Sequence, residues 1–234
     1  MNTFVGLVGL FPRSTLSRHL RQRWREHERG DRQRDVRRCV TVLIFCFIRR
    51  MTEYSSNLIL LYCDYCYEGT LFGQRAVDRV TAHGSSADLA GVPFFMYLAF
   101  HNEHDPHQAP LETLTGERAE KIPLDVYKIT ASLIQTMDLQ VGRVIDALNS
   151  TGMLATTVIG FSSDNGGPLD HANNWPFRGG KHTFWEGGVR TEAFVWSPLL
   201  PKSRRGTEWA GLAHLADWFY TYAVGVGTLV SSII

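Results

Sequence analysis

The fold is decided by residues 125–167, which read DVYKITASLIQTMDLQVGRVIDALNSTGMLATTVIGFSSDNGG. Apolar residues recur there at steps of three and four, which predicts a long helix over 125–150 with one apolar face. The stripe consists of Val126, Ile129, Leu133, Met137, Val141, Ile145 and Leu148. Pro123 precedes the helix and Gly152 follows it, as start and stop signals do. The β-branched segment at 156–161 then predicts a strand that ends in a polar turn.

Further elements of both kinds lie on either side. Upstream, the pattern predicts a helix over 71–83, a loop over 84–88 and a buried strand over 93–100. Downstream, it predicts a strand over 191–196 and a helix over 209–222. Strands that alternate with helices predict an α/β fold with a mostly parallel sheet flanked by helices.

The composition is that of an ordinary globular protein, with 44% hydrophobic and 20% charged residues and a net charge of +1. The stretch from Arg13 to Arg38 holds ten arginines and four acidic residues. A run of this kind can bind nucleic acid, but no aromatic platform or known motif surrounds it, so a solvated tail is favoured. No nucleic-acid partner is therefore predicted.

No membrane anchor or leader is predicted. The apolar run at 40–48 is too short to cross a bilayer, which takes about 20 helical residues, and a buried strand is favoured. Residues 1–11 show no convincing signal peptide, because they lack a basic start and a cleavage site.

Four cysteines lie in the first third of the chain: Cys39, Cys46, Cys63 and Cys66. Cys63 and Cys66 have the spacing of half a zinc site, but the sequence contains no second pair at suitable spacing. Unpaired structural thiols are the simpler interpretation.

Two polar clusters follow predicted strands. One is the histidine loop His101–His107, and the other is the Asp164–Asn165 turn. Ligands of α/β sheets sit at the carboxyl ends of the strands, so we expect both clusters at one rim of the sheet.

Asp164 and Asn165 offer a carboxylate and an amide oxygen, the hard ligands that Ca²⁺ and Mg²⁺ prefer. The following Gly166 and Gly167 allow tight turning beside an ion. DNGG is also good chemistry for an ordinary turn, and that alternative stays open.

His101, His104 and His107 recur at every third position. Three imidazoles could bind zinc, but Pro106 and the lack of a helical pattern disfavour a regular metal-binding face. A single functional histidine that gives a proton to a leaving group is simpler.

Two further residues are candidates for chemistry or modification. Lys181 is preceded by two glycines and could hold an oxyanion such as sulfate or phosphate, or be a surface lysine. Asn149 starts an Asn-Ser-Thr tripeptide, the acceptor pattern for N-glycosylation, which matters in a chain that enters the secretory pathway.

Three stretches carry a family resemblance: PFFMYLAFHNEHDPHQAP at 93–110, VIGFSSDNGG at 158–167 and NNWPFRGGKHTFWEGGVRTEAFVWSP at 173–198. Together they resemble the sulfatase family, and the third is similar to its arylsulfatase B-like members. The resemblance implies the alkaline phosphatase-like fold of sulfatases. It implies hydrolysis of sulfate esters, with sulfated glycans as candidate substrates, in a lysosomal or secreted glycoprotein.

The resemblance also implies roles for individual residues. Asp164 and Asn165 match the family's Ca²⁺ ligands, and Lys181 matches the lysine that holds the sulfate ester. His104 matches the histidine that contacts the sulfate and the leaving-group oxygen.

Other family features have no counterpart here. The family makes its nucleophile, formylglycine, from the cysteine of a C-x-P-S-R motif, which this sequence lacks. The early pair of metal-binding aspartates and the G-K-W-H-L-G segment are also missing. We therefore expect an unassigned segment at 1–66, a partial sulfatase catalytic domain at 67–222 and a short apolar tail at 223–234.

We expect this chain to be inactive alone and poorly stable. One alternative is a non-catalytic sulfatase-like protein that binds a sulfated glycan or a protein partner. Another is a phosphate-ester hydrolase of the wider superfamily, which the sulfatase-like stretch at 173–198 disfavours.

Overall fold

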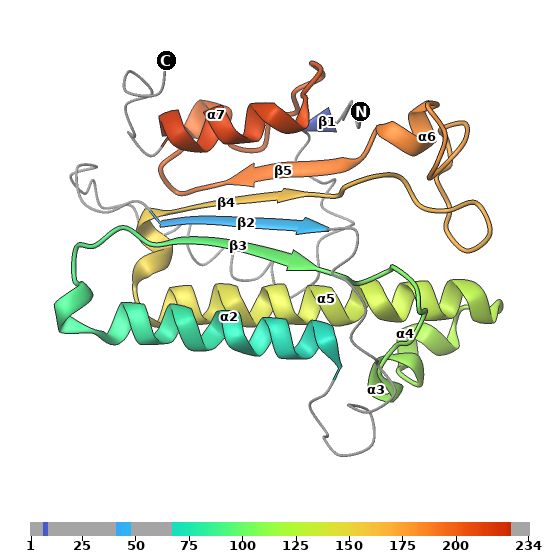
Figure 1. Cartoon of the computed structure of the whole chain (residues 1–234), viewed down its shortest axis with the longest axis horizontal. Coiled ribbons are helices and arrows are strands. Elements are labelled where there is room, and N and C mark those ends of the chain that lie inside the picture. Colours follow the sequence, from blue (N-terminus) through green and yellow to red (C-terminus); the bar gives the residue numbers. More distant parts are fainter. Residues whose placement is uncertain (1–6, 9–40, 48–66, 226–234) are drawn as a thin grey trace.

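A five-stranded sheet forms the centre of the computed structural model, which describes residues 7–8, 41–47 and 67–225. The strand order is β1-β5-β4-β2-β3 (Figure 1). The bounds are β1 Leu7–Val8, β2 Thr41–Phe47, β3 Phe95–Phe100, β4 Thr157–Ser162 and β5 Glu192–Trp196. The pairs β2–β3, β2–β4 and β1–β5 are parallel, whereas β4–β5 is antiparallel. The predicted mostly parallel sheet is confirmed, with the reversed β5 as its exception.

Two long helices, α2 (Glu68–Ser85) and α5 (Asp125–Ser150), run side by side along the sheet, and α7 (Leu215–Gly225) lies beyond β5 (Figure 1). The short helices are η1 Ala87–Leu89, α3 Leu111–Leu114, α4 Glu117–Glu120, η2 Met153–Thr156, α6 Glu186–Val189 and η3 Lys202–Arg204. The prediction of α5 is confirmed at both ends, and the helix predicted over 71–83 lies within α2.

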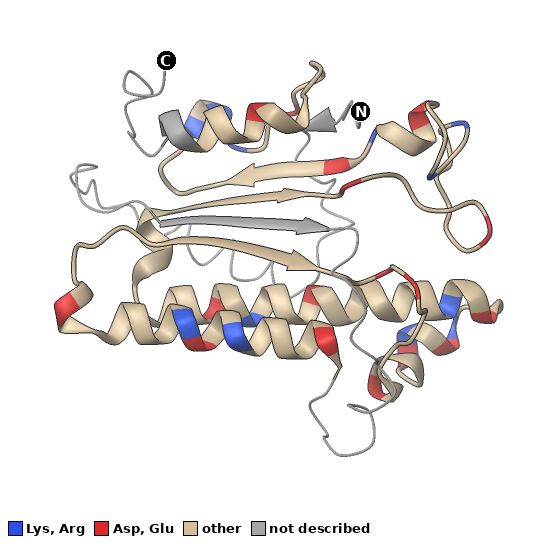
Figure 2. Ribbon diagram, in the orientation of Figure 1, with Lys and Arg blue, Asp and Glu red and all other residues tan. Residues whose placement is uncertain are grey.

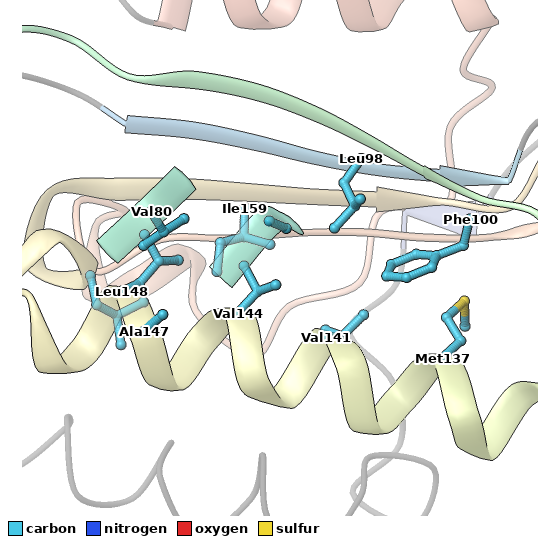
Figure 3. Close-up of a cluster of buried hydrophobic side chains, with 11 residues drawn as sticks. Val80, Leu98, Phe100, Met137, Val141, Val144, Ala147, Leu148 and Ile159 are labelled. Carbon is cyan, nitrogen blue, oxygen red and sulfur yellow. The ribbon is translucent and has the colours of Figure 1, made fainter. Parts of the chain in front are cut away.

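The hydrophobic core lies between α2, α5 and one face of the sheet (Figure 3). Val144 and Leu148 of α5 point toward Ile159 of β4, and Val80 of α2 joins them; Val80, Val144 and Leu148 are fully buried. Burying one such side chain contributes about 1.5–3 kcal/mol. Most of the predicted α5 stripe faces this core, which fixes the helix on the sheet.

Three sequence-based expectations need correction. The strand predicted as buried, β3, is half exposed: Leu98 and Phe100 face the core, but Phe95 and Tyr97 are 62% and 47% exposed. The reason is its place at the end of the strand order, with α2 and α5 against one face. The loop predicted at 84–88 is partly helical, because Gly84, lacking a Cβ, lets α2 continue close to Thr151.

The third correction concerns α7, which begins at Leu215 and not at Trp209. His214 caps this helix, since its Nδ1 accepts the Ala216 N–H at 3.1 Å. Asp217 Oδ2 accepts the His214 backbone N–H at 2.6 Å. These two bonds resemble a capping box, with histidine in place of Ser or Thr and with the second helical N–H, not the third, as the donor to the cap side chain.

The predicted strand at 40–48 is present as β2, between β3 and β4. The arginine-rich run at 13–38 lies outside the described residues, as do Cys39, Cys63 and Cys66. The division of the chain at 66/67 and at 222/223 stays a prediction. Of the helices in the described ranges, none is long and apolar enough to cross a membrane.

Candidate functional site

A pocket of about 250 Å³ opens where β3 and β4 end and β5 begins. His104, Asp164, Asn165 and Lys181 all line it, although they come from three separate segments of the chain. The expectation that both polar clusters share one rim is therefore confirmed. Figure 2 shows acidic residues at this edge, at the ends of strands whose central parts are uncharged.

Hydrogen bonds between side chains and the local backbone hold the Asp164–Asn165 turn. The Asn165 N–H donates to Asp164 Oδ1 at 2.8 Å, and the Ser163 hydroxyl donates to the Asn165 carbonyl at 3.1 Å. The Asn165 amide nitrogen donates to the Gly166 carbonyl at 3.0 Å, so the amide oxygen is the atom this side chain can offer to a cation. The turn is thus well formed and presents hard oxygens to the pocket.

The loop that carries Lys181 is tied back to this turn. The Lys181 N–H donates to the Gly167 carbonyl at 3.0 Å, and the Gly166 N–H donates to the Gly188 carbonyl at 3.0 Å. A Cβ on Gly166 would overlap the Gly187 carbonyl, so glycine is required for this close approach. These contacts bring a lysine from a distant loop beside Asp164.

His104 is held by a bond to the neighbouring backbone. Its Nδ1 lies 3.1 Å from the Asp105 carbonyl, which can accept but not donate, so the proton lies on Nδ1. Nε2 is then available to a ligand in the pocket. The His101 ring stacks on His104 with centroids 5.1 Å apart, and His101 Nδ1 lies 3.1 Å from Glu68 Oε2.

The three histidines do not converge. His101 and His104 line the pocket, whereas His107 packs edge-on against His171 at 3.8 Å and donates to the Glu103 carbonyl. Within the ranges that the structure describes, no group of three His, Cys, Asp or Glu side chains could hold a metal ion. The zinc alternative therefore has no support in the geometry of this loop.

Glu103 is a pocket residue that no sequence pattern singled out. Burial, together with the charge of Asp164, raises the pKa of its carboxyl to about 7. Its backbone is in the left-handed region, with φ of 74°. The histidine loop contains two acids, Glu103 and Asp105, and nothing in the sequence indicated that Glu103 is partly buried whereas Asp105 is exposed.

The charges of the pocket are mixed. Burial raises the pKa of Asp164, and the Asn165 N–H and the charges of Lys181 and His104 oppose that shift. Arg190 also lines the pocket, with its guanidinium 4.7 Å above the Phe177 ring. Three carboxyl groups (Glu103, Asp164, Glu192) and two cations (Lys181, Arg190) share the lining, so the positive charges are largely offset and an anion needs additional positive charge to bind tightly.

The pocket lining includes two oxygen-bearing side chains of the type that Ca²⁺ prefers. Asp164 and Asn165 are ligands of the right type, but Ca²⁺ takes six to eight oxygens. No cysteine lines the described pocket, and the sequence lacks the motif for formylglycine. The glycosylation candidate Asn149 is exposed in the last turn of α5, away from the residues that line the pocket.

The sequence matches the Sulfatase family over residues 54–224. It is 34% identical to mouse arylsulfatase J over 168 residues, which cover 71% of this chain and 27% of that protein. It is 30% identical to mouse N-acetylgalactosamine-6-sulfatase over 134 residues, which cover 55% of this chain and 23% of that protein. The chain thus spans about a quarter of the length of these relatives.

Solved structures share the fold. The chain superposes on Ps i-CgsB in complex with k-i-k-neocarrahexaose with a TM-score of 0.65 and 22% identity, covering 81% of this chain and 51% of that one. It superposes on the PsFucS1 sulfatase from Pseudoalteromonas sp. with a TM-score of 0.50 and 24% identity. This match covers 73% of this chain and 34% of that one. The predicted sulfatase-type α/β fold is therefore confirmed.

Proposed function

The chain belongs to the sulfatase family, and from that premise we propose that its pocket binds sulfate esters as part of a sulfuric ester hydrolase. One observation carries the proposal: His104, Asp164, Asn165 and Lys181 line the same pocket. These are the four residues that the family resemblance selects from the sequence.

Each residue has a role suited to its chemistry. The Lys181 ammonium is a point charge with three donors for the sulfate oxygens. His104, with its proton on Nδ1, can contact the ester oxygen through Nε2 and deliver a proton there when it is charged. Asp164 and Asn165 would hold Ca²⁺, which would supply the positive charge that the pocket needs.

Hydrolysis also needs a nucleophile, and the described pocket contains no cysteine to provide one. We therefore propose that this chain alone binds a sulfate ester without turning it over. The same observation favours the second candidate, a non-catalytic protein that binds a sulfated glycan. One relative is named for a sulfated amino sugar, and one structural neighbour was solved with a neocarrahexaose, which supports a sugar as the carrier of the sulfate.

The experiment is calorimetric titration of the chain with inorganic sulfate and with phenyl sulfate, with and without Ca²⁺, beside an assay for released phenol. We expect saturable binding of both anions, strengthened by Ca²⁺, and no phenol. Binding of neither anion would contradict the proposed site, and released phenol would contradict inactivity of the chain alone.

We also propose that the protein follows a lysosomal or secreted route and is glycosylated at Asn149. A lysosomal or secreted route, as the resemblance implies, would expose the Asn-Ser-Thr acceptor to glycosylation. The exposed position of Asn149 at the end of α5 leaves room for a glycan.

A further inference from the structure

Trp175 lines the pocket, yet 83% of it is exposed. A large aromatic ring normally buries most of its surface. An exposed ring at the mouth of a polar pocket offers a flat apolar surface to whatever enters. This surface is the starting point for identifying the group that accompanies the sulfate.

The backbone around Trp175 is held firmly. The neighbouring Asn174 side chain accepts the Gly167 N–H and donates to the Gly167 carbonyl, both at 2.8 Å. The Trp175 N–H donates to Asn173 Oδ1 at 2.9 Å. Because Gly167 also accepts the Lys181 N–H, one residue anchors both Trp175 and the proposed sulfate-binding lysine.

The two phenylalanine rings that line the pocket are not open in the same way. Phe100 is 2% exposed, and the Phe177 ring carries the Arg190 guanidinium at 4.7 Å. The Trp185 ring carries the Arg178 guanidinium at 4.0 Å. In the described part of the chain, no ring or guanidinium stacks on Trp175, so its indole faces are open to a ligand.

We infer that Trp175 is a stacking residue for the sugar ring that carries the sulfate, and this inference rests on the proposed function of the pocket. One face of a pyranose presents C–H groups that are apolar and slightly positive. The face of an indole is apolar and negative, so the two surfaces attract each other. A sulfate placed at Lys181 leaves its sugar ring at the mouth of the pocket, where Trp175 stands.

Preorganisation makes this contact effective. A ring on an anchored backbone loses little freedom when a ligand binds, so most of the stacking energy appears as affinity. An aromatic contact of this kind changes affinity by about three- to tenfold. Inorganic sulfate has no sugar ring, so its affinity should not depend on Trp175.

The test compares N-acetylgalactosamine 6-sulfate with inorganic sulfate as ligands of the full chain, by calorimetry and by saturation-transfer NMR from protein to sugar protons. Trp175→Ala should weaken binding of the sulfated sugar about three- to tenfold and leave sulfate binding unchanged. Trp175→Phe should retain most of the sugar affinity. Trp209→Ala is the matched control, because Trp209 is 49% exposed but does not line the pocket.

The outcomes separate the inference from the proposed function. Equal affinity of the wild type and Trp175→Ala for the sugar would overturn the stacking role while leaving the sulfate site intact. If Trp175→Ala loses affinity for the sugar and for sulfate equally, the substitution has displaced the loop. In that case Trp175→Phe decides: retained affinity for the sugar supports the stacking role, and lost affinity overturns it. If the wild type binds neither ligand, the proposed function fails and the inference fails with it.

Discussion

Glu103 and Asp164 place two carboxyl groups in one pocket, and the charge of Asp164 helps burial to raise the pKa of Glu103 to about 7. A buried carboxyl with a raised pKa binds its proton more tightly in the folded chain than in the unfolded chain. Its contribution to stability is therefore present at acid pH and is lost as the pH rises toward 7.

The first prediction concerns this pH dependence. Between about pH 4.5 and pH 7 the free energy of unfolding should fall, at up to about 1.4 kcal/mol per pH unit from Glu103 alone. Glu103→Gln cannot ionise, so it should flatten this decline, although Asp164, whose pKa is also raised, leaves part of it. Urea unfolding at a series of pH values measures the effect.

The exposed Glu208→Gln serves as its control and should keep the wild-type slope. If the free energy of unfolding of Glu103→Gln falls with pH as steeply as that of the wild type, the pKa of Glu103 is not raised in the folded chain.

The second prediction concerns Lys181, the cation proposed to bind sulfate. Lys181→Ala should weaken binding of inorganic sulfate at least tenfold, because a charge-assisted hydrogen bond contributes about 1.5–3 kcal/mol. Lys181→Arg should keep part of the affinity, since it keeps the charge but changes the geometry. Lys121→Ala is the control, because Lys121 pairs with Glu117 on the surface at 71% exposure. Calorimetry that found Lys181→Ala and the control equal would remove Lys181 from the site.

The third prediction concerns Ca²⁺. Because the described residues supply a carboxylate and an amide oxygen, Ca²⁺ should bind weakly, in the millimolar range. Millimolar Ca²⁺ should then raise the melting temperature slightly, in proportion to its occupancy of the folded chain. Asp164→Ala should abolish this shift, whereas the exposed Asp88→Asn should keep it. A shift that persists in Asp164→Ala would place the ion elsewhere.

The fourth prediction concerns how α7 is docked on the sheet. A Cβ on Gly160 of β4 would overlap the Tyr222 hydroxyl of α7. Gly160→Ala should therefore destabilise the chain by about 1–3 kcal/mol. In a Tyr222→Ala background the same change should cost less, because the overlap is gone. Equal costs in both backgrounds, measured by urea unfolding, would show that the two residues do not touch.

The fifth prediction concerns Asn149. When the chain is directed through a eukaryotic secretory pathway, it should gain a glycan that an amidase removes. Asn149→Gln should lose this mass, since Asn149 is the exposed acceptor in its tripeptide. Mass spectrometry of the tryptic peptide decides the matter, and an unmodified peptide from secreted protein would contradict it.

The elements that the sequence predicted best are those with a strong local signal. The helix at 125–150 was predicted to its ends, because its apolar period is unbroken and Pro123 and Gly152 mark its limits. The start of α7 was missed because His214 is an unusual cap whose partner, Asp217, becomes evident when the turn is seen. A local pattern thus predicts that an element exists, but an atypical cap makes its observed end differ from the predicted one.

Properties that depend on packing could not be predicted. The exposure of Tyr97 follows from the place of β3 at the end of the sheet, which no pattern within the strand encodes. The partial burial of Glu103 and the approach of Lys181 to Gly167 follow from how loops fold over one another. The four candidate site residues could still be selected from the sequence, because the motifs around them are long and specific to the family.

The most direct test of the sulfate-ester pocket is an NMR titration of the chain with phenyl sulfate, with resonances of the His104 ring and the Lys181 side chain followed together. If one pocket binds the ester, both should shift with a single dissociation constant, and the distant His214 ring should not. Shifts with different constants, or no shift at His104 and Lys181, would contradict the assignment of these residues to one sulfate-ester site.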